Sequence, residues 1–274
     1  MRASATAPAS SANLGPGFDF LALALEIRCR VTLEHASEWS IPLEAEAIVK
    51  EVTAVVGSPG PFAVTIESDI PVGRGLGSSA ALAVATAVAA MRADEQEPDP
   101  AVILAAASGV EGHPDNAAAA VYGGLVAVSP SGPRRLTLAP TLLPVVAVPN
   151  QTLATAEARD ALPATLPHAA AARSAARAAF LIEGLRTGDA DALAAAVGDE
   201  LHEGPRAALS PLTTHLIEVA LRAGALHAAW SGAGPSVLAL ATANSVDAIE
   251  GALKDELAED GRVLRPSIAI SGLA

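Results

Sequence analysis

The sequence Pro71-Val-Gly-Arg-Gly-Leu-Gly-Ser-Ser-Ala-Ala81 decides the fold of this chain. Before it, Phe62, Val64 and Ile66 alternate with small or polar residues, which predicts a half-buried strand. After it, residues 80–91 are almost all Ala, Val and Leu, which predicts a helix buried on most sides. The glycines between them allow positive φ and a close approach of the backbone to a ligand. Such a loop predicts a phosphate site, because the amide donors and the helix dipole both favour an anion.

The same glycine pattern also fits a tight turn before a core helix, with Ser78 or Ser79 as its N-cap. The loop is not a P-loop, because no Lys follows Gly77. It is not a dinucleotide fingerprint either, since its glycines are spaced Gly-x-Gly-x-Gly and the next acid, Asp94, follows the helix. The His-Arg-Asp and Asp-Phe-Gly motifs of protein kinases do not occur. The loop therefore predicts a phosphate site of another type.

The composition limits the partners of the chain. Of its 274 residues 51% are hydrophobic and only 3% aromatic, so the core must be built from small aliphatic side chains. A net charge of −13 argues against a nucleic acid or an anionic membrane as partner. The two lysines, Lys50 and Lys254, lie far from the glycine motif. An anionic substrate would therefore need arginines.

The single cysteine, Cys29, excludes an internal disulfide framework and favours a reducing cytoplasm. It lies on the apolar side of a predicted strand, so we interpret it as a core residue and not as a nucleophile. No segment has the length of a membrane span, and the first residues show no signal-peptide pattern.

In the first half of the chain, residues 1–7 predict a short strand and residues 8–19 a turn-rich segment. Apolar residues then recur at strict period two from Leu21 to Leu33, which predicts a long strand with one wet face. Helices are expected at residues 44–56 and 100–109, and a short one at 117–122 with Asp115 or Asn116 as N-cap. Strands are expected at residues 125–128, 135–138 and 143–149.

After Pro149 the pattern becomes helical, with stretches at residues 153–162, 168–185, 189–201 and 212–223. Strands at 226–230 and 237–241, a helix at 245–257 and a strand at 263–270 follow. This order predicts an antiparallel sheet with helices on one face. We place a domain boundary near Pro140, which divides the chain into residues 1–140 and 141–274.

Five segments in order along the chain resemble the GHMP small-molecule kinases. They are the glycine loop, Ser10-Ser-Ala-Asn-Leu-Gly-Pro-Gly-Phe-Asp19, Glu111-Gly-His-Pro-Asp-Asn116, Pro149-Asn-Gln-Thr-Leu-Ala-Thr-Ala-Glu-Ala-Arg159 and Ser231-Gly-Ala-Gly-Pro-Ser236. The first of these segments along the chain has no Lys or Arg, and it is most similar to that of the homoserine kinase branch. The resemblance implies an α+β fold with two domains. The N-terminal one is α/β and like domain 2 of ribosomal protein S5, and the C-terminal one is ferredoxin-like.

The implied activity is ATP-dependent phosphorylation of the side-chain hydroxyl of L-homoserine to O-phospho-L-homoserine, a step of threonine biosynthesis. The implied cofactors are ATP and Mg²⁺, and dimers are common in the family. A mevalonate-pathway or other small-alcohol kinase is the alternative within the family. Phe20, Ala22 and Trp230 depart from the family pattern and leave the fine shape of the substrate site open.

The resemblance also implies the site residues. For ATP they are Pro71, Val72, Gly73, Arg74, Gly75, Leu76, Gly77, Ser78, Ser79, Ala80 and Ala81. Ser78 and Glu111 would hold the metal, although Ser78 also fits a plain N-cap and Glu111 a helix-end carboxylate. Arg74 would add charge at the phosphates, or lie solvated on the surface.

On the substrate side, the resemblance assigns the homoserine ammonium to Asp19 and the hydroxyl to Asn13, and gives both residues catalytic roles beside Ser78 and Glu111. Arg159 and Arg206 would clamp the carboxylate, because a guanidinium grips it with two parallel bonds. A surface arginine on a helix is the other interpretation of Arg159. Thr155 would orient the hydroxyl or line the pocket, and the turn at Gly232 would leave room beside the phosphate loop.

Two functions of other classes remain as alternatives. Ser78, His113 and Asp115 suggest a hydrolase triad, but no Gly-x-Ser-x-Gly elbow surrounds Ser78 or the neighbouring Ser79. A non-catalytic nucleotide-sensing module would keep the phosphate loop without phosphoryl transfer. No general base stands out, since Asp19 would be occupied by the ammonium and no lysine is suitably placed. Transfer would then depend on positioning and charge stabilisation.

Overall fold

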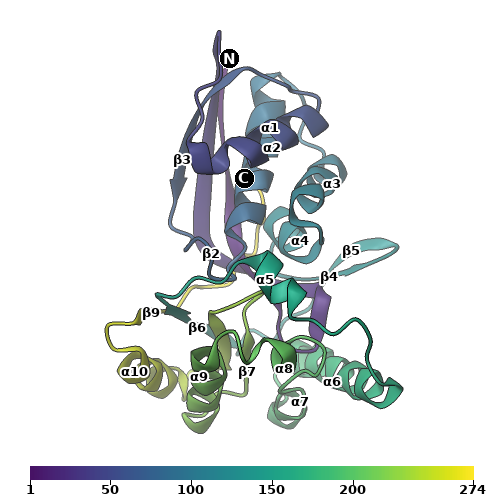
Figure 1. Ribbon diagram of the computed structural model, residues 1–274, viewed down its shortest axis with the longest axis vertical. Helices are drawn as coiled ribbons and strands as arrows, with labels where there is room; N and C mark the ends of the chain where they lie inside the picture. Colours follow the sequence, from purple (N-terminus) through teal and green to yellow (C-terminus); the bar gives the residue numbers. More distant parts are fainter.

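The computed structural model describes residues 1–274 and contains two antiparallel β-sheets, one above the other in Figure 1. The first sheet is organised by its longest strand, β2, which pairs with β1 on one side and with β3 and β4 on the other. β5 pairs with β4 at the edge. The strands are β1 (Arg2–Asn13), β2 (Gly17–His35), β3 (Phe62–Ser68), β4 (Leu125–Ser129) and β5 (Gly132–Leu136).

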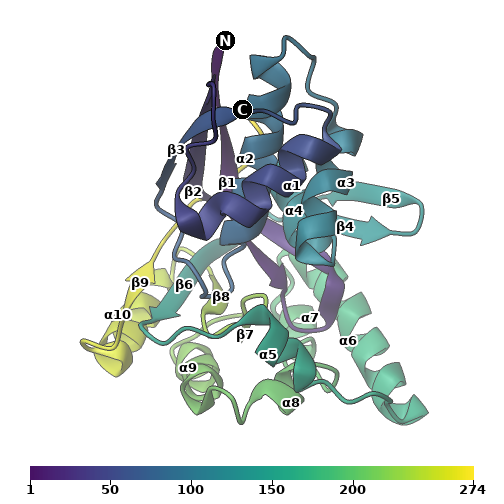
Figure 2. The same ribbon diagram turned by 45° about the horizontal axis from the view of Figure 1, so that its top comes forward.

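Four helices pack on one face of this sheet (Figures 1 and 2). They are α1 (Glu46–Val55), preceded by the short 3₁₀ turn η1 (Leu43–Ala45), α2 (Ser78–Ala93), α3 (Pro100–Glu111) and α4 (Asp115–Tyr122). α2 is the central one and contacts both β1 and β2. Its alanines let it approach the sheet closely, and Ala5, Ala7 and Ala9 of β1 are buried beneath the helices. The core is therefore aliphatic, as the composition predicts.

The second sheet is antiparallel, as the order of the predicted elements indicates, and its strand order β7-β8-β6-β9 is the ferredoxin-like arrangement that the family resemblance implies. Its strands are β6 (Leu143–Pro149), β7 (His227–Trp230), β8 (Val237–Ala241) and β9 (Gly261–Leu264). Its helices are α5 (Thr155–Asp160), α6 (His168–Thr187), α7 (Ala190–Ala195), α8 (Glu203–Arg206), α9 (Pro211–Arg222) and α10 (Val246–Leu257). α9 and α10 cover one face with a separate apolar cluster. The predicted two-part α+β fold is confirmed, whereas the boundary near residue 140 stays a prediction.

The last ten residues return to the first sheet, so that the C-terminus lies beside α2 in Figure 1. Ala274 and Thr6 exchange two backbone hydrogen bonds of 3.0 and 3.1 Å. Ala269 donates to Ala24 and accepts from Gly124. We call this returning segment, residues 265–274, the C-terminal strap. The sequence predicts a last strand at residues 263–270, but β9 ends at Leu264.

Several local predictions are wrong. The segment from Pro8 to Asn13 is the second half of β1 and not a turn, and a register irregularity between Pro8 and Ala9 accommodates the proline. α7 ends at Ala195, and the four-residue α8 was not predicted. None of the helices combines the length and apolar character needed to cross a membrane.

Candidate active site

A cavity of about 440 Å³ lies between the two sheets, where the phosphate loop, β1, α5 and α8 meet. This volume suits a small-molecule site. Its wall contains Asn13, Asp19, residues 71–79, Glu111, Thr155, Arg159, Arg206 and Gly232. The structure therefore gathers almost all of the predicted site residues. Ala80 and Ala81 are the exception, because they are buried inside α2.

The phosphate loop adopts the backbone that its glycines allow. Gly73, Gly75 and Gly77 have φ of 68°, 70° and 65°, in the left-handed region. A Cβ on Gly77 would collide with the Ser10 hydroxyl. Gly77 is the N-cap of α2 and no side chain caps the helix, so the predicted serine cap is wrong. The first amides of α2 thus remain available to an anion in the cavity.

Gly75 is also one of the points where the loop contacts the second half of the chain. Its carbonyl accepts a 2.7 Å hydrogen bond from the Ser231 hydroxyl, and an added Cβ would overlap the Ser231 carbonyl oxygen. Arg74 spans the same seam, because its guanidinium donates to the carbonyls of Pro149, Val72 and Asn150. Arg74 therefore fixes the loop to the end of β6.

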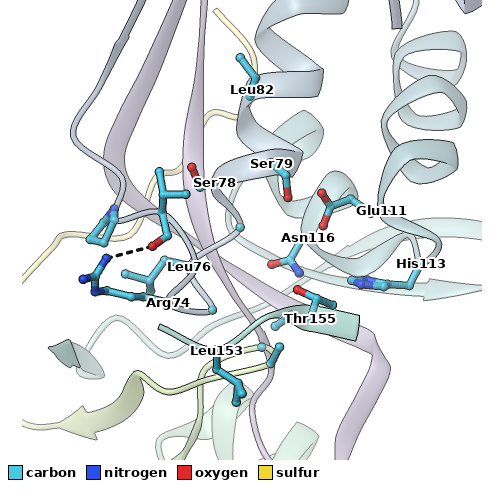
Figure 3. Close-up of a pocket in the computed structure, with 18 of the residues that line it drawn as sticks. Arg74, Leu76, Ser78, Ser79, Leu82, Glu111, His113, Asn116, Leu153 and Thr155 are labelled. Atoms are coloured by element: carbon cyan, nitrogen blue, oxygen red, sulfur yellow. Dashed lines mark hydrogen bonds between the residues drawn. The ribbon is translucent and has the colours of Figure 1, made fainter. Parts of the chain in front are cut away.

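An acidic and polar group lines the side of the cavity nearest α3 and α4 (Figure 3). The Ser79 hydroxyl points toward the Glu111 carboxylate, and Ser78 points away from it. Burial raises the pKa of Glu111, and the neighbouring Ser79 and His113 oppose that rise. Geometry thus places Ser79, more than Ser78, beside the carboxylate.

His113 and Asp115 form a buried pair in the same wall, with Nδ1 2.6 Å from Oδ1. Burial works to lower the pKa of His113, but the hydrogen bond and charge of Asp115 outweigh it and the net shift is upward. Asp115 also accepts from the Asn116 amide at 2.7 Å. The expected capping by Asp115 or Asn116 is wrong in detail, because Pro114 is the N-cap and Asp115 is the first helical residue.

Asn116 lies against the phosphate loop and accepts a 2.8 Å hydrogen bond from the Ser10 hydroxyl. Asn116 was not predicted as a site residue and His113 was considered only for a hydrolase triad, although both line the cavity and belong to the segment that contains Glu111. Their presence in a quoted motif was the signal that could have found them.

Asp19 and Arg159 form an ion pair with each other, although the family resemblance assigns Asp19 to the substrate ammonium and Arg159 to the substrate carboxylate. Arg159 Nη2 lies 2.6 Å from Asp19 Oδ1, and Nη1 lies 3.1 Å from Oδ2. Both side chains are about one-third exposed, at 34% and 35%. Arg206, in contrast, is buried, and burial lowers its pKa to about 10 with help from the charge of Arg159.

Asn13 is held by the backbone around it. Its Oδ1 accepts from the Asp19 amide at 3.0 Å, and its Nδ2 donates to the Gly232 carbonyl at 3.0 Å. Asn13, Leu14 and Asp19 all have positive φ, which is uncommon for residues with a side chain. Asn13 therefore stabilises the unusual path that presents Asp19 to the cavity.

The remaining wall, near β2, β3 and η1, is mostly apolar: it includes Ile48, Ile66 and Leu82, together with Glu44 and Ser68. Cys29 borders this part and belongs to the main core, as predicted. Burial raises the pKa of its thiol, which suits an inert side chain. The cavity thus has an apolar end suited to a flat ring and a charged end suited to a small polar molecule.

The fold and this cavity define a small-molecule kinase of the GHMP type. Residues 44–124 match the model of the GHMP kinases N-terminal domain, and residues 181–259 match that of the GHMP kinases C-terminal domain. The homoserine kinase of Moorella thermoacetica is 39% identical over 251 residues, covering 85% of each chain. That of Streptomyces coelicolor is 39% identical over 267 residues, covering 89% of this chain and 85% of the relative.

A solved homoserine kinase from Cytophaga hutchinsonii superposes with a TM-score of 0.88 at 26% identity, covering all of this chain and 96% of that one. The chain belongs to the homoserine kinase family of the GHMP kinases.

Proposed function

We propose that this chain transfers the γ-phosphoryl group of ATP to the side-chain hydroxyl of L-homoserine. The observation that supports this most directly is one cavity that joins an uncapped helix N-terminus behind a glycine loop to a cluster of one carboxylate and two arginines. The high identity to homoserine kinases over most of the chain supports the same substrate. A hydrolase or a nucleotide sensor accounts for neither the family nor the whole cavity.

The nucleotide end fits ATP on its own geometry. The left-handed glycines bring the backbone of residues 73–77 to the cavity surface, where amides can hold the β- and γ-phosphates. The apolar wall around Ile48, Ile66 and Leu82 would take the adenine ring. Arg74 donates to three carbonyls, so we assign it to holding the loop in place and not to neutralising phosphate.

The donor set beside the loop also fits Mg²⁺, which takes one or two protein oxygens together with phosphate and water. Glu111 supplies the carboxylate, and a serine hydroxyl from the first turn of α2 supplies a second oxygen. Both Ser78 and Ser79 line the cavity, and Ser79 is the one aimed at Glu111. When bound, the metal would neutralise charge on the transferring phosphoryl group.

The substrate end matches an amino-acid zwitterion. In our proposal the ammonium of homoserine binds Asp19, and its carboxylate binds Arg159 and Nη2 of Arg206, the guanidinium nitrogen that makes no hydrogen bond within the protein. The bidentate Arg159–Asp19 pair already has the geometry that a substrate carboxylate would adopt on the guanidinium. Thr155 lines the cavity at the start of the same helix as Arg159 and is suited to orient the hydroxyl.

The catalytic contribution of Asn13 is indirect in this proposal, because its two polar atoms already bind Asp19 and Gly232. Asp19 is committed to charge pairing, so we assign no dedicated base. Transfer then depends on in-line positioning and on charge stabilisation by the loop amides and the metal. An ATP-dependent enzyme with one unpaired, buried cysteine is expected in the cytoplasm.

A coupled assay of ADP release tests the proposal with homoserine, mevalonate, galactose and serine as acceptors. We expect homoserine to give by far the highest kcat/KM. A preference for mevalonate or galactose would contradict the substrate while leaving the kinase class intact, and no turnover of any acceptor would contradict both. Light scattering on the same sample measures whether the homodimer common in the family forms.

A further inference from the structure

We propose that His202 is a positioning residue that joins the loop carrying Asp19 to the substrate-binding guanidinium of Arg206. This inference rests on the proposed function, because it concerns the carboxylate end of that substrate site. His202 does not line the cavity and is fully buried behind it.

Both ring nitrogens of His202 are engaged. Nε2 lies 2.8 Å from the Gly15 carbonyl, and Nδ1 lies 3.1 Å from Nη1 of Arg206. A carbonyl only accepts and a guanidinium only donates, so Nε2 must carry the proton and Nδ1 the lone pair. The ring is then neutral, in agreement with a pKa lowered to about 4 by burial and by the charge of Arg206. One imidazole in one tautomer thus connects two elements of the site.

The hydrogen bond that Arg206 donates to His202 completes the fixation of its guanidinium. Nε of Arg206 donates to the Ala158 carbonyl at 3.0 Å, and Nη1 also donates to the Gly232 carbonyl at 3.2 Å. Nη2 has no protein partner, and Arg206 lines the cavity. Hydrogen bonds from Nε and Nη1 therefore fix the guanidinium, and Nη2 is the nitrogen left for the substrate. Loss of the His202 acceptor would leave Nη1 with only its 3.2 Å bond to Gly232, so the guanidinium would be held less firmly in its orientation.

Phe18 transmits the same constraint to the second arginine. Its ring stacks on His202 with centroids 5.1 Å apart, and the guanidiniums of Arg206 and Arg159 lie 5.5 and 5.6 Å from its centroid. The imidazole of His202 therefore packs against the ring that both guanidiniums contact, and this ring belongs to the residue directly before Asp19. His202 is thus connected to the carboxylate end by a hydrogen bond and by a stack.

His227 offers a matched control. It is also fully buried, and its Nε2 lies 3.0 Å from the carbonyl of Leu14, the residue before Gly15. Its Nδ1 lies 3.2 Å from the Leu193 carbonyl, and it has no contact with Arg206. His227 therefore supports the same loop without supporting the guanidinium.

The test compares His202→Gln, His202→Asn and His227→Gln on homoserine and on homoserinol, which lacks the carboxylate. Gln reaches Gly15 through its amide nitrogen but loses the acceptor at Arg206, whereas Asn keeps an oxygen at the position of Nδ1. We expect His202→Gln to raise the KM for homoserine about 10- to 100-fold, the range for one hydrogen bond to a charged group. Its KM for ATP and its kcat/KM on homoserinol should stay within about threefold of wild type.

His202→Asn should have a KM for homoserine close to that of wild type. His227→Gln should change kcat/KM by the same factor on homoserine and on homoserinol. If His202→Gln lowered kcat/KM equally on both acceptors, or left the KM for homoserine unchanged, the inference about His202 would be overturned and the proposed function would stand. A wild-type protein that phosphorylated no homoserine would overturn the proposed function and the inference together. If thermal melting shows that the His202 variants do not fold, Phe18→Leu at a half-buried position takes their place, with the same selective loss on homoserine expected.

Discussion

The ion pair between Arg159 and Asp19 makes the effect of Arg159→Leu opposite in sign for two acceptors. With homoserine, the variant loses two charged hydrogen bonds to the carboxylate, together worth about 3 kcal/mol. In wild type, homoserine must first break the Arg159–Asp19 ion pair, and this cost is absent in the variant. The pair is about one-third exposed, so it is worth at most about 1 kcal/mol. The net cost is about 2 kcal/mol, or roughly a 30-fold loss in kcat/KM.

With homoserinol there is no carboxylate to lose, and the variant only frees Asp19 for the ammonium. We therefore expect kcat/KM on homoserinol to rise, by up to about fivefold. The difference between the two substrates is the coupling that assigns Arg159 to the carboxylate.

The assay is ADP release with both acceptors, for wild type, Arg159→Leu and the control Arg186→Leu. Arg186 also forms a bidentate pair, with Glu183 on an exposed face of α6, so its variant should leave both acceptors unchanged. Equal losses on homoserine and homoserinol in Arg159→Leu would refute the reasoning. Arg159 would then act on a phosphate or in the fold.

Three further predictions concern the nucleotide, the metal and the pH dependence of stability. Gly77→Val should abolish ATP binding measured by calorimetry while circular dichroism stays native, because φ is +65° and a Cβ would collide with Ser10; unchanged affinity would make the loop an ordinary turn. Ser79→Ala and Glu111→Gln should each lower kcat at least about 10-fold and raise the Mg²⁺ concentration for half-activity, with Ser78→Ala as the matched neighbour; a larger effect of Ser78→Ala would restore the metal role first expected for that residue. Burial raises the pKa of Glu203 to about 7, above its unfolded value of 4.5, so its contribution to stability is present below pH 4.5 and is lost as the pH rises through 7. Glu203→Gln should therefore gain in melting temperature relative to wild type between pH 5 and pH 8, and a difference independent of pH would show that Glu203 does not titrate there.

The parts of the site that could be predicted from sequence are those fixed by local geometry. Gly73, Gly75 and Gly77 predict a loop because each glycine by itself can adopt a positive φ, whatever its distant neighbours are. The long strand from Leu21 to Leu33 could be predicted because one face of β2 is exposed to solvent beyond Leu25, which gives the sequence its alternation of apolar and polar residues. Both signals lie within a short window of the chain.

The parts that could not be predicted depend on distant neighbours. Residues 8–13 look like a turn because they are small and polar, but they form a strand buried on both faces, where hydrophobic contrast disappears. The Asp19–Arg159 pair joins positions 140 residues apart. Whether Ser78 or Ser79 faces Glu111 depends on the residue at which α2 begins, and sequence patterns locate helix ends least well.

The chain contains two sheets, but the C-terminal strap makes them one cooperative unit of unfolding. Residues 265–274 follow the second sheet in sequence, but their backbone completes hydrogen bonds of Thr6, Ala24 and Gly124 in the first part. If the second part melted alone, it would strip these partners from β1, β2 and the end of α4 and leave buried polar groups unsatisfied. The two sheets should therefore unfold together in a single transition, with the cavity between them lost in the same event.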